Sequence, residues 1–258
     1  MSALDRAGVR IHYEVRGSGP ALLLTHGFSA SCAMWAKSAD RLAQTHTVVT
    51  WDIRGHGASD CPPDQSLYTV PLTVGDMAAL LDAIGAKRAV VAGHSLGGFL
   101  SLEFHLAHPE RVAALALIDT GPGYRSEGPR AGWNDRIEKM AAAFERKGFA
   151  ALGAGAEVRA ATHRDPLGLA RAARGILAQH DGRVIESVPK IGVPTLVLVG
   201  EKDDAFLAGS RYMAEKIPGA ELAVIPGAGH SPNLEKPEEF HRALEGFLSR
   251  ASAARTRS

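Results

Sequence analysis

A serine flanked by glycines, directly after an apolar run, is the feature of this sequence that most clearly suggests chemistry. Ser95 lies in "AVVAGHSLGG", residues 89–98, where a predicted β-strand ends. Gly93 and Gly97 keep Cβ atoms out of a tight turn from strand to helix. Such a turn presents the Ser95 hydroxyl at the start of a helix, where free backbone N–H groups favour negative charge. The spacing therefore predicts a nucleophilic serine.

A serine hydroxyl needs a base to remove its proton before it attacks a carbonyl. The chain has 11 histidines, and "AVIPGAGH" places His230 on a glycine-rich loop after a predicted strand. His230 is therefore the candidate base. We expect His94 to be structural, and His12, His46 and His241 to be ordinary surface residues.

A histidine base needs a carboxylate to fix its tautomer and to stabilise the imidazolium that forms. "TLVLVGEKDD" offers Asp203 and Asp204 beside Glu201 after one predicted strand, and "ALIDTG" offers Asp119 after an earlier one. The residue types leave the acid open among Asp203, Asp204 and Asp119.

These side chains need a scaffold that brings strand ends together. Short apolar runs alternate with segments of helical spacing, which predicts an α/β fold with a mostly parallel, doubly wound sheet. "VRIHYEV" alternates apolar and polar residues, as a half-exposed antiparallel strand does. The runs expected to be parallel strands buried on both faces are "ALLLTHG", "TVVTWDIRG", "AVVAGHS", "ALALIDTG", "TLVLVGE" and "ELAVIPG". Because the carboxyl ends of parallel strands meet at one edge, ligands are expected there.

One interval interrupts the alternation. Residues 122–188 show no strand pattern and contain Ala-rich amphipathic segments, which predict an inserted helical cap. We therefore expect a core made of residues 1–121 and 189–258, a cap made of residues 122–188, and a frayed tail at residues 251–258.

Composition excludes several classes of function. The 29 basic and 28 acidic residues give a net charge of +1, so no electrostatic footprint for nucleic acid or an anionic membrane is present. Cys32 and Cys61 lack metal-ligand spacing and predict two reduced thiols. No signal peptide, membrane-spanning run, zinc motif, phosphate loop or dinucleotide fingerprint is found. We expect a cytoplasmic monomer or small homo-oligomer without metal or cofactor.

The motifs also match a known family when they are taken in order. "THGFS", "DIRGHGASD", "GHSLGG", "VGEKDD" and "GAGHS" span nearly the whole chain. This series resembles the α/β-hydrolase superfamily, and most closely its small serine esterases, lactonases and perhydrolases with a helical cap. The resemblance implies an α/β-hydrolase fold with Ser95 as nucleophile and His230 as base. It assigns the acid to Asp203, three residues after a glycine, although some relatives carry the acid at the position of Asp119.

The resemblance also implies an oxyanion hole, and the composition of the cap suggests a substrate pocket. The backbone N–H groups of Phe28 and Leu96 would hold the oxyanion, while Asp52, Arg54 and His56 in "DIRGHGASD" are expected to be structural. Phe28, Trp133 and Phe144 are the candidate pocket residues, since Trp133 and Phe144 are large apolar side chains in an Ala-rich cap. Simple packing of the cap onto the sheet is the alternative.

Departures from neighbouring families narrow the function. The nucleophile is Ser95 rather than Asp or Cys, which argues against haloalkane dehalogenases, epoxide hydrolases and dienelactone-type hydrolases. Ser231 follows His230, where carbon–carbon bond hydrolases usually carry Trp. We therefore expect a carboxylic-ester hydrolase that acts on a small-molecule ester or lactone through an acyl-enzyme. A lactonase, a carbon–carbon hydrolase and a small-molecule receptor on the same fold are the alternatives.

Overall fold

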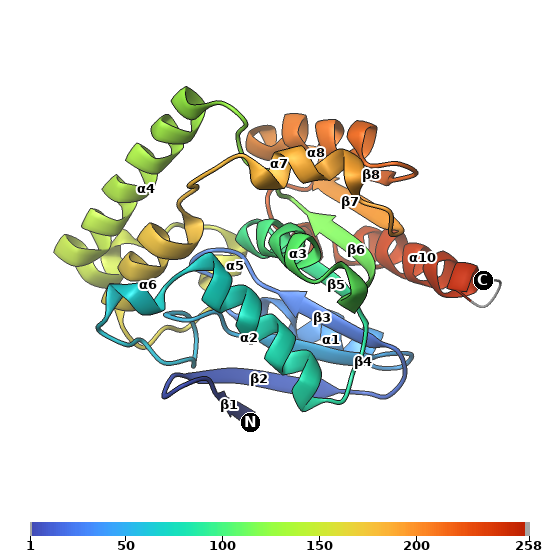
Figure 1. The fold of residues 1–258 in the computed structure, drawn as a ribbon, viewed down its shortest axis with the longest axis horizontal. Coiled ribbons are helices and arrows are strands. Elements are labelled where there is room, and N and C mark those ends of the chain that lie inside the picture. Colours follow the sequence, from blue (N-terminus) through green and yellow to red (C-terminus); the bar gives the residue numbers. More distant parts are fainter. Residues whose placement is uncertain (1, 256–258) are drawn as a thin grey trace.

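A single twisted sheet forms the centre of the molecule (Figure 1). The computed structural model describes residues 2–255, with only the backbone for residues 253–255. In this part of the chain the strand order is β1-β2-β4-β3-β5-β6-β7-β8. β2 pairs antiparallel with β1 and β4, and the other neighbours are parallel. The strands are β1 (Ser2–Asp5), β2 (Arg10–Arg16), β3 (Ala21–Thr25), β4 (Thr47–Trp51), β5 (Ala89–His94), β6 (Val112–Ile118), β7 (Thr195–Gly200) and β8 (Glu221–Ile225).

Helices cover both faces of the sheet, which confirms the predicted doubly wound α/β fold. Helices α2, α3 and α8 pack on one face, and α1 and α10 pack on the other. The helices are α1 (Ala36–Leu42), α2 (Val70–Ala83), α3 (Leu96–Ala107), α4 (Glu127–Lys147), α5 (Ala156–Arg159), α6 (Pro166–Ala172), α7 (Arg183–Ser187), α8 (Asp204–Lys216), α9 (Pro232–Glu235) and α10 (Pro237–Arg255). Strand β1 was not predicted, because four residues carry too little alternation.

Strands β3 to β7 are largely apolar because helices cover both faces of the sheet. In β3, Leu23 belongs to the core under α2 and α3, while Leu22 and Leu24 belong to the core under α1 and α10. β8 departs from this expectation. It is an edge strand, and Leu222 and Val224 are 43% and 38% exposed.

The regular elements within residues 122–188 are all helical. α4 and α6 lie together to one side of the sheet (Figure 1) and share a small apolar cluster centred on Ile137, Phe144 and Leu169. Val184 of α7 instead belongs to the core beneath α3. The division into core and cap at residues 122 and 188 remains a prediction.

Helix α10 extends into the segment that was expected to fray. α10 continues to Arg255, and Ala251 is buried with Phe247 and Leu248 against the sheet. The frayed tail predicted at residues 251–258 stays a prediction, and residues 256–258 lie outside the described residues. Among residues 2–255, no helix combines the length and the apolar character needed to cross a membrane.

Candidate active site

Ser95 occupies a strained turn between β5 and α3. Its φ of 51° and ψ of −115° are rare for a residue with a side chain. The Ser95 N–H donates to the Ile118 carbonyl at 2.9 Å, and Thr120 Oγ1 donates to the Ser95 carbonyl at 2.7 Å. A Cβ at position 93 would lie 2.0 Å from the Gly97 carbonyl oxygen, so only glycine allows α3 to begin this close to β5. The turn has the geometry of a nucleophile elbow.

His230 and Asp203 meet at the carboxyl edge of the sheet. His230 Nδ1 lies 2.7 Å from Oδ2 of Asp203, a carboxylate that is 6% exposed. The ring of Phe206 stacks on His230 at 5.1 Å. His94 Nε2 donates to the His230 carbonyl at 2.6 Å, so the residue preceding Ser95 holds the His230 loop beside the elbow. This contact gives His94 a structural role that its sequence position did not specify.

The other candidate acids occupy different environments. Asp119 is buried, and its Oδ1 accepts the Gly200 N–H at 2.8 Å. Burial, followed by the neighbouring Asp203 carboxylate, raises the pKa of Asp119 to about 9. Asp204 is exposed at the first turn of α8. The fold therefore brings Asp119 and Asp203 together with His230 and leaves Asp204 on the surface.

Two groups of side chains in residues 2–255 have donor atoms close enough for a metal ion. One donor atom each from Asp119, Asp203 and His230 lie within 4.8 Å of one another, as do donor atoms of His12, Glu14 and Cys32. In the first group, His230 Nδ1 and Asp203 Oδ2 already contact each other at 2.7 Å. In the second group, burial raises the pKa of the Cys32 thiol far above its usual value, which disfavours the thiolate that a metal requires.

The expected oxyanion donors lie on both sides of the elbow. Leu96 is the first residue of α3, so its N–H has no acceptor within the helix. Phe28 lies in a turn closed by the Ala30 N–H, which donates to the Gly27 carbonyl at 3.2 Å. A Cβ on Gly27 would lie 2.7 Å from His94 Nδ1 and 3.1 Å from Ser95 Cβ, so the turn packs directly against the elbow.

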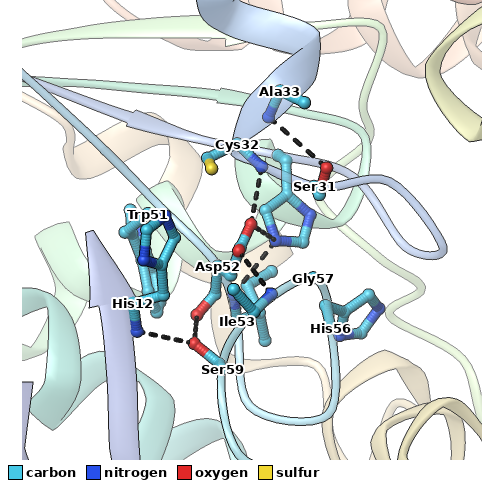
Figure 2. Close-up of polar contacts among 12 residues, drawn as sticks. His12, Ser31, Cys32, Ala33, Trp51, Asp52, Ile53, His56, Gly57 and Ser59 are labelled. Atoms are coloured by element: carbon cyan, nitrogen blue, oxygen red, sulfur yellow. Dashed lines mark hydrogen bonds and ion pairs between the residues drawn. The ribbon is translucent and has the colours of Figure 1, made fainter. Parts of the chain in front are cut away.

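Asp52 joins the segment that follows this turn to the loop at residues 52–59 (Figure 2). Its Oδ1 accepts the Cys32 N–H at 2.7 Å, and its Oδ2 accepts the Ala58 N–H at 2.8 Å. Ser59 Oγ donates to the Asp52 carbonyl and accepts the His12 N–H, which joins the same loop to β2. Asp52 thus anchors loops through backbone groups.

Arg54, His26 and His56 also stabilise the loop at residues 52–59 and the turn that contains Phe28. Arg54 donates to the buried Asp76 carboxylate, with Nη2 2.8 Å from Oδ1. His26 Nδ1 donates to the Gly27 carbonyl at 2.7 Å, and Nε2 accepts the Ile53 N–H at 3.0 Å. Burial lowers the pKa of His26 to about 4, which keeps the ring neutral. The ring of His56 stands between His26 and Phe28, at 5.2 and 5.3 Å.

A cavity of about 240 Å³ opens at Ser95 and Leu96. Its other walls include Phe99, Tyr124, Trp133, Leu177, Gln179 and Phe206, and none of the lining residues within the described chain carries a charge. Trp133 Nε1 donates to the Leu177 carbonyl at 3.0 Å, which fixes the indole in the wall. Of the three pocket residues expected from the sequence, only Trp133 lines this cavity.

Phe28 and Phe144 are not among the residues that line the cavity. Their rings pack edge to face at 6.1 Å, and Phe144 is 2% exposed. Packing therefore accounts for Phe144. Sequence reasoning missed Phe206, in the first turn of α8, and Tyr124, in the loop before α4, because no sequence pattern places either position at a cavity.

The expectation that His12, His46 and His241 lie on the surface was wrong. All three are buried, at 8%, 8% and 3% exposure. His241 contacts Ser38 Oγ at 2.9 Å, and His46 contacts Thr45 Oγ1 at 2.8 Å. A histidine with a local hydrogen-bond partner is accommodated in the interior as a neutral ring, and burial lowers the pKa of His241 and His46.

Fold, elbow and carboxyl-edge cluster together define an α/β hydrolase. Residues 22–243 match the model of the alpha/beta hydrolase family, so the chain belongs to that family. The membership and the names of its relatives support hydrolase activity.

The relatives of this chain are named for different activities. The chain is 28% identical to a putative 2-succinyl-6-hydroxy-2,4-cyclohexadiene-1-carboxylate synthase of Bacillus subtilis, over 93% of this chain and 95% of that protein. It is 32% identical to the pimeloyl-[acyl-carrier protein] methyl ester esterase of Chromobacterium violaceum, over 93% and 98%. Among solved structures, a thermophilic esterase from Thermogutta terrifontis superposes with a TM-score of 0.84 at 27% identity, over 96% and 97%.

Proposed function

We propose that this protein is a serine hydrolase that cleaves carboxylic esters of small molecules through an acyl-enzyme. The observation that carries the proposal is the 2.7 Å contact between His230 Nδ1 and Asp203 Oδ2 at the edge where Ser95 forms a strained elbow. This contact directs the proton-bearing nitrogen of a neutral His230 toward Asp203 and leaves Nε2 as the base. The esterase relatives support the same reaction class.

In the proposed mechanism, Ser95 Oγ attacks the ester carbonyl carbon while His230 Nε2 accepts its proton. Asp203 stabilises the resulting imidazolium. The N–H groups of Phe28 and Leu96 stabilise the oxyanion of the tetrahedral intermediate. His230 then protonates the departing alcohol, and water, deprotonated by His230, hydrolyses the acyl-Ser95 ester.

The cavity beside Ser95 supports small, uncharged substrates. Its volume of about 240 Å³ is below the roughly 300–1,000 Å³ of pockets for drug-sized ligands. A carboxylate on the acyl group would lose its hydration there without gaining a cationic partner in the wall. We therefore propose neutral acyl groups of short to medium length, with lactones included as cyclic esters.

A fluorophosphonate probe tests the nucleophile directly. Peptide mass spectrometry should find the label on Ser95, and Ser95→Ala should lower kcat by on the order of 10⁴ or more. Ser101→Ala removes another buried hydroxyl of α3, which donates to the Gly97 carbonyl, and serves as the matched control with activity and labelling retained. A label on another serine, or equal activity in Ser95→Ala, would refute the proposal.

A panel of aliphatic esters, aryl esters and lactones then defines the substrate. Burst kinetics with a chromogenic ester are expected, because the acyl-enzyme accumulates when deacylation is slow. Tight binding of esters without turnover would instead favour the receptor alternative.

A further inference from the structure

Residues 155–165, which we call the strap, run from the start of α5 to the residue that caps α6, and they touch both catalytic loops. His163 lies against the Phe28 turn, and Glu157 lies against the residue that follows His230. Within the described chain, no strap residue lines the cavity at Ser95. The strap therefore contacts the loops that carry the proposed catalytic residues, and it does not line the cavity in which the substrate would bind.

His163 connects two loops through both ring nitrogens. Nδ1 accepts the Gly57 N–H at 3.0 Å, and because a backbone N–H can only donate, the ring proton resides on Nε2. Nε2 lies 3.1 Å from the Ser29 carbonyl and donates to it. Burial lowers the pKa of His163, which favours this neutral form.

A hydrogen bond to the Ser29 carbonyl restrains the backbone next to the proposed oxyanion donor. Ser29 has a φ of 54°, in the left-handed region that a residue with a side chain occupies at a cost. It directly follows Phe28, whose N–H is the proposed oxyanion donor. The ring of His163 also contacts His56 at 5.9 Å, and His56 contacts Phe28 at 5.3 Å. His163 thus restrains the turn through backbone and ring contacts.

Glu157 provides the second anchor. It is 8% exposed, and its carboxylate accepts the Ser231 hydroxyl proton. The Ser231 N–H donates to Glu235 Oε1 at 2.9 Å, so the residue after His230 is held from two sides. Burying a carboxylate is costly unless it is hydrogen-bonded. Glu157 lies away from the proposed proton path, so we interpret its burial through this contact with the His230 loop.

We propose that the strap positions the oxyanion loop through His163 and the His230 loop through Glu157, so that its seating completes the catalytic geometry. His163 and Glu157 are positioning residues, because they act through Ser29 and Ser231. The inference rests on the proposed ester hydrolysis. Loss of either anchor should lower the rate of the chemical step without weakening substrate binding in the cavity.

The first test compares three variants. His163→Phe keeps a ring against His56 and Phe149 but removes both hydrogen bonds, whereas the amide of His163→Gln can still donate to the Ser29 carbonyl. With a p-nitrophenyl ester we expect kcat of His163→Phe to fall about 10- to 100-fold with KM within about twofold, since small misplacements have effects of this size. His163→Gln should recover most of the loss. Phe149→Leu, which removes the ring stacked on His163, is the matched control and should retain wild-type kcat.

Glu157 gives an independent arm. Glu157→Gln keeps an acceptor for Ser231 and should retain kcat, while Glu157→Ala should lower kcat at constant KM. A boronic acid that mimics the tetrahedral intermediate should lose affinity in parallel with kcat in His163→Phe. Unchanged kcat in both His163→Phe and Glu157→Ala would overturn the proposal, and a lower Tm at unchanged kcat would leave the strap with packing alone.

Amide hydrogen exchange separates this inference from the proposed function. Peptides covering residues 26–31 and 53–58 should exchange at least about tenfold faster in His163→Phe than in the wild type, because the Gly57 N–H loses its acceptor. An inert wild type without Ser95 labelling would refute ester hydrolysis while this arm still reports on the strap. Unchanged exchange in both peptides would overturn the strap proposal even in an active enzyme.

Discussion

The buried carboxyl group of Asp119 faces that of Asp203 at the carboxyl edge of the sheet. One donor atom of each, together with one of His230, lie within 4.8 Å of one another. Burial and the neighbouring Asp203 carboxylate raise the pKa of Asp119 to about 9, which favours its protonated form beside an acid that contacts the base. Two neighbouring carboxyl groups thus have different environments and are expected to have different roles.

The two acids should respond differently to the same substitution. Asp203→Asn should lower kcat by on the order of 10³ to 10⁴, because the amide no longer stabilises the imidazolium or fixes its tautomer. Asp119→Asn and Asp204→Asn should each cost less than about tenfold. Steady-state kinetics on one ester decide the matter, and a reversed order of Asp203 and Asp119 would move the acid to the earlier strand.

Asp119 should also make stability depend on pH. Its pKa rises from 3.8 to about 9 on folding, so between these values the folded state binds more protons than the unfolded state. The associated stability is complete below about pH 4 and is lost as the pH rises toward 9, by on the order of a few kcal/mol. Chemical denaturation across this range measures the slope.

Asp119→Asn should flatten that dependence. The Asn side chain cannot ionise, its oxygen can accept the Gly200 N–H, and its amide can donate to Asp203. Asp204→Asn, at an exposed site, is the control that should keep the wild-type slope. An equal slope in wild type and Asp119→Asn would show that Asp119 is ionised in the folded protein.

On the acid side, the logarithm of kcat/KM for ester hydrolysis should fall by one for each unit of pH. A single base, His230, must be neutral to accept the Ser95 proton. The nearby His94 and His26 should not contribute to this decline. Burial holds the pKa of His94 well below its usual value and lowers the pKa of His26 to about 4. The measurement is kcat/KM against pH, and a rate that stays flat down to about pH 4 would exclude a histidine base.

Trp133 and Phe144 should differ in what they control. Trp133→Leu enlarges the cavity, so the preferred acyl chain should lengthen. Each added methylene should contribute about 0.8 kcal/mol of binding free energy until the cavity is filled. Phe144→Leu removes packing in the cluster between α4 and α6, so Tm should fall while the preferred chain length stays unchanged. Profiles of kcat/KM over a series of p-nitrophenyl esters show both effects. Short to medium chains without interfacial activation are expected for the wild type.

The motifs determined much of the local structure. The six continuous apolar runs correspond to β3–β8, most of which are covered on both faces of the sheet, and the alternating run corresponds to β2. The glycines around Ser95 indicated a turn that only glycine can form, and such a turn has the same consequence in any fold that contains it. Ser95, His230, Asp203 and Asp119 could therefore be assigned to one edge from strand ends alone.

What depends on contacts between distant segments was decided only by the tertiary structure. Residue types could not separate Asp203 from Asp119, since both follow buried strands, and their difference arises from burial and from the single contact with His230. The contacts of His163 with Ser29 and Gly57 join segments more than a hundred residues apart. Helical segments such as α4 repeat their apolar positions whether they line a cavity or pack on a neighbour, so only the folded chain distinguishes Trp133 from Phe144.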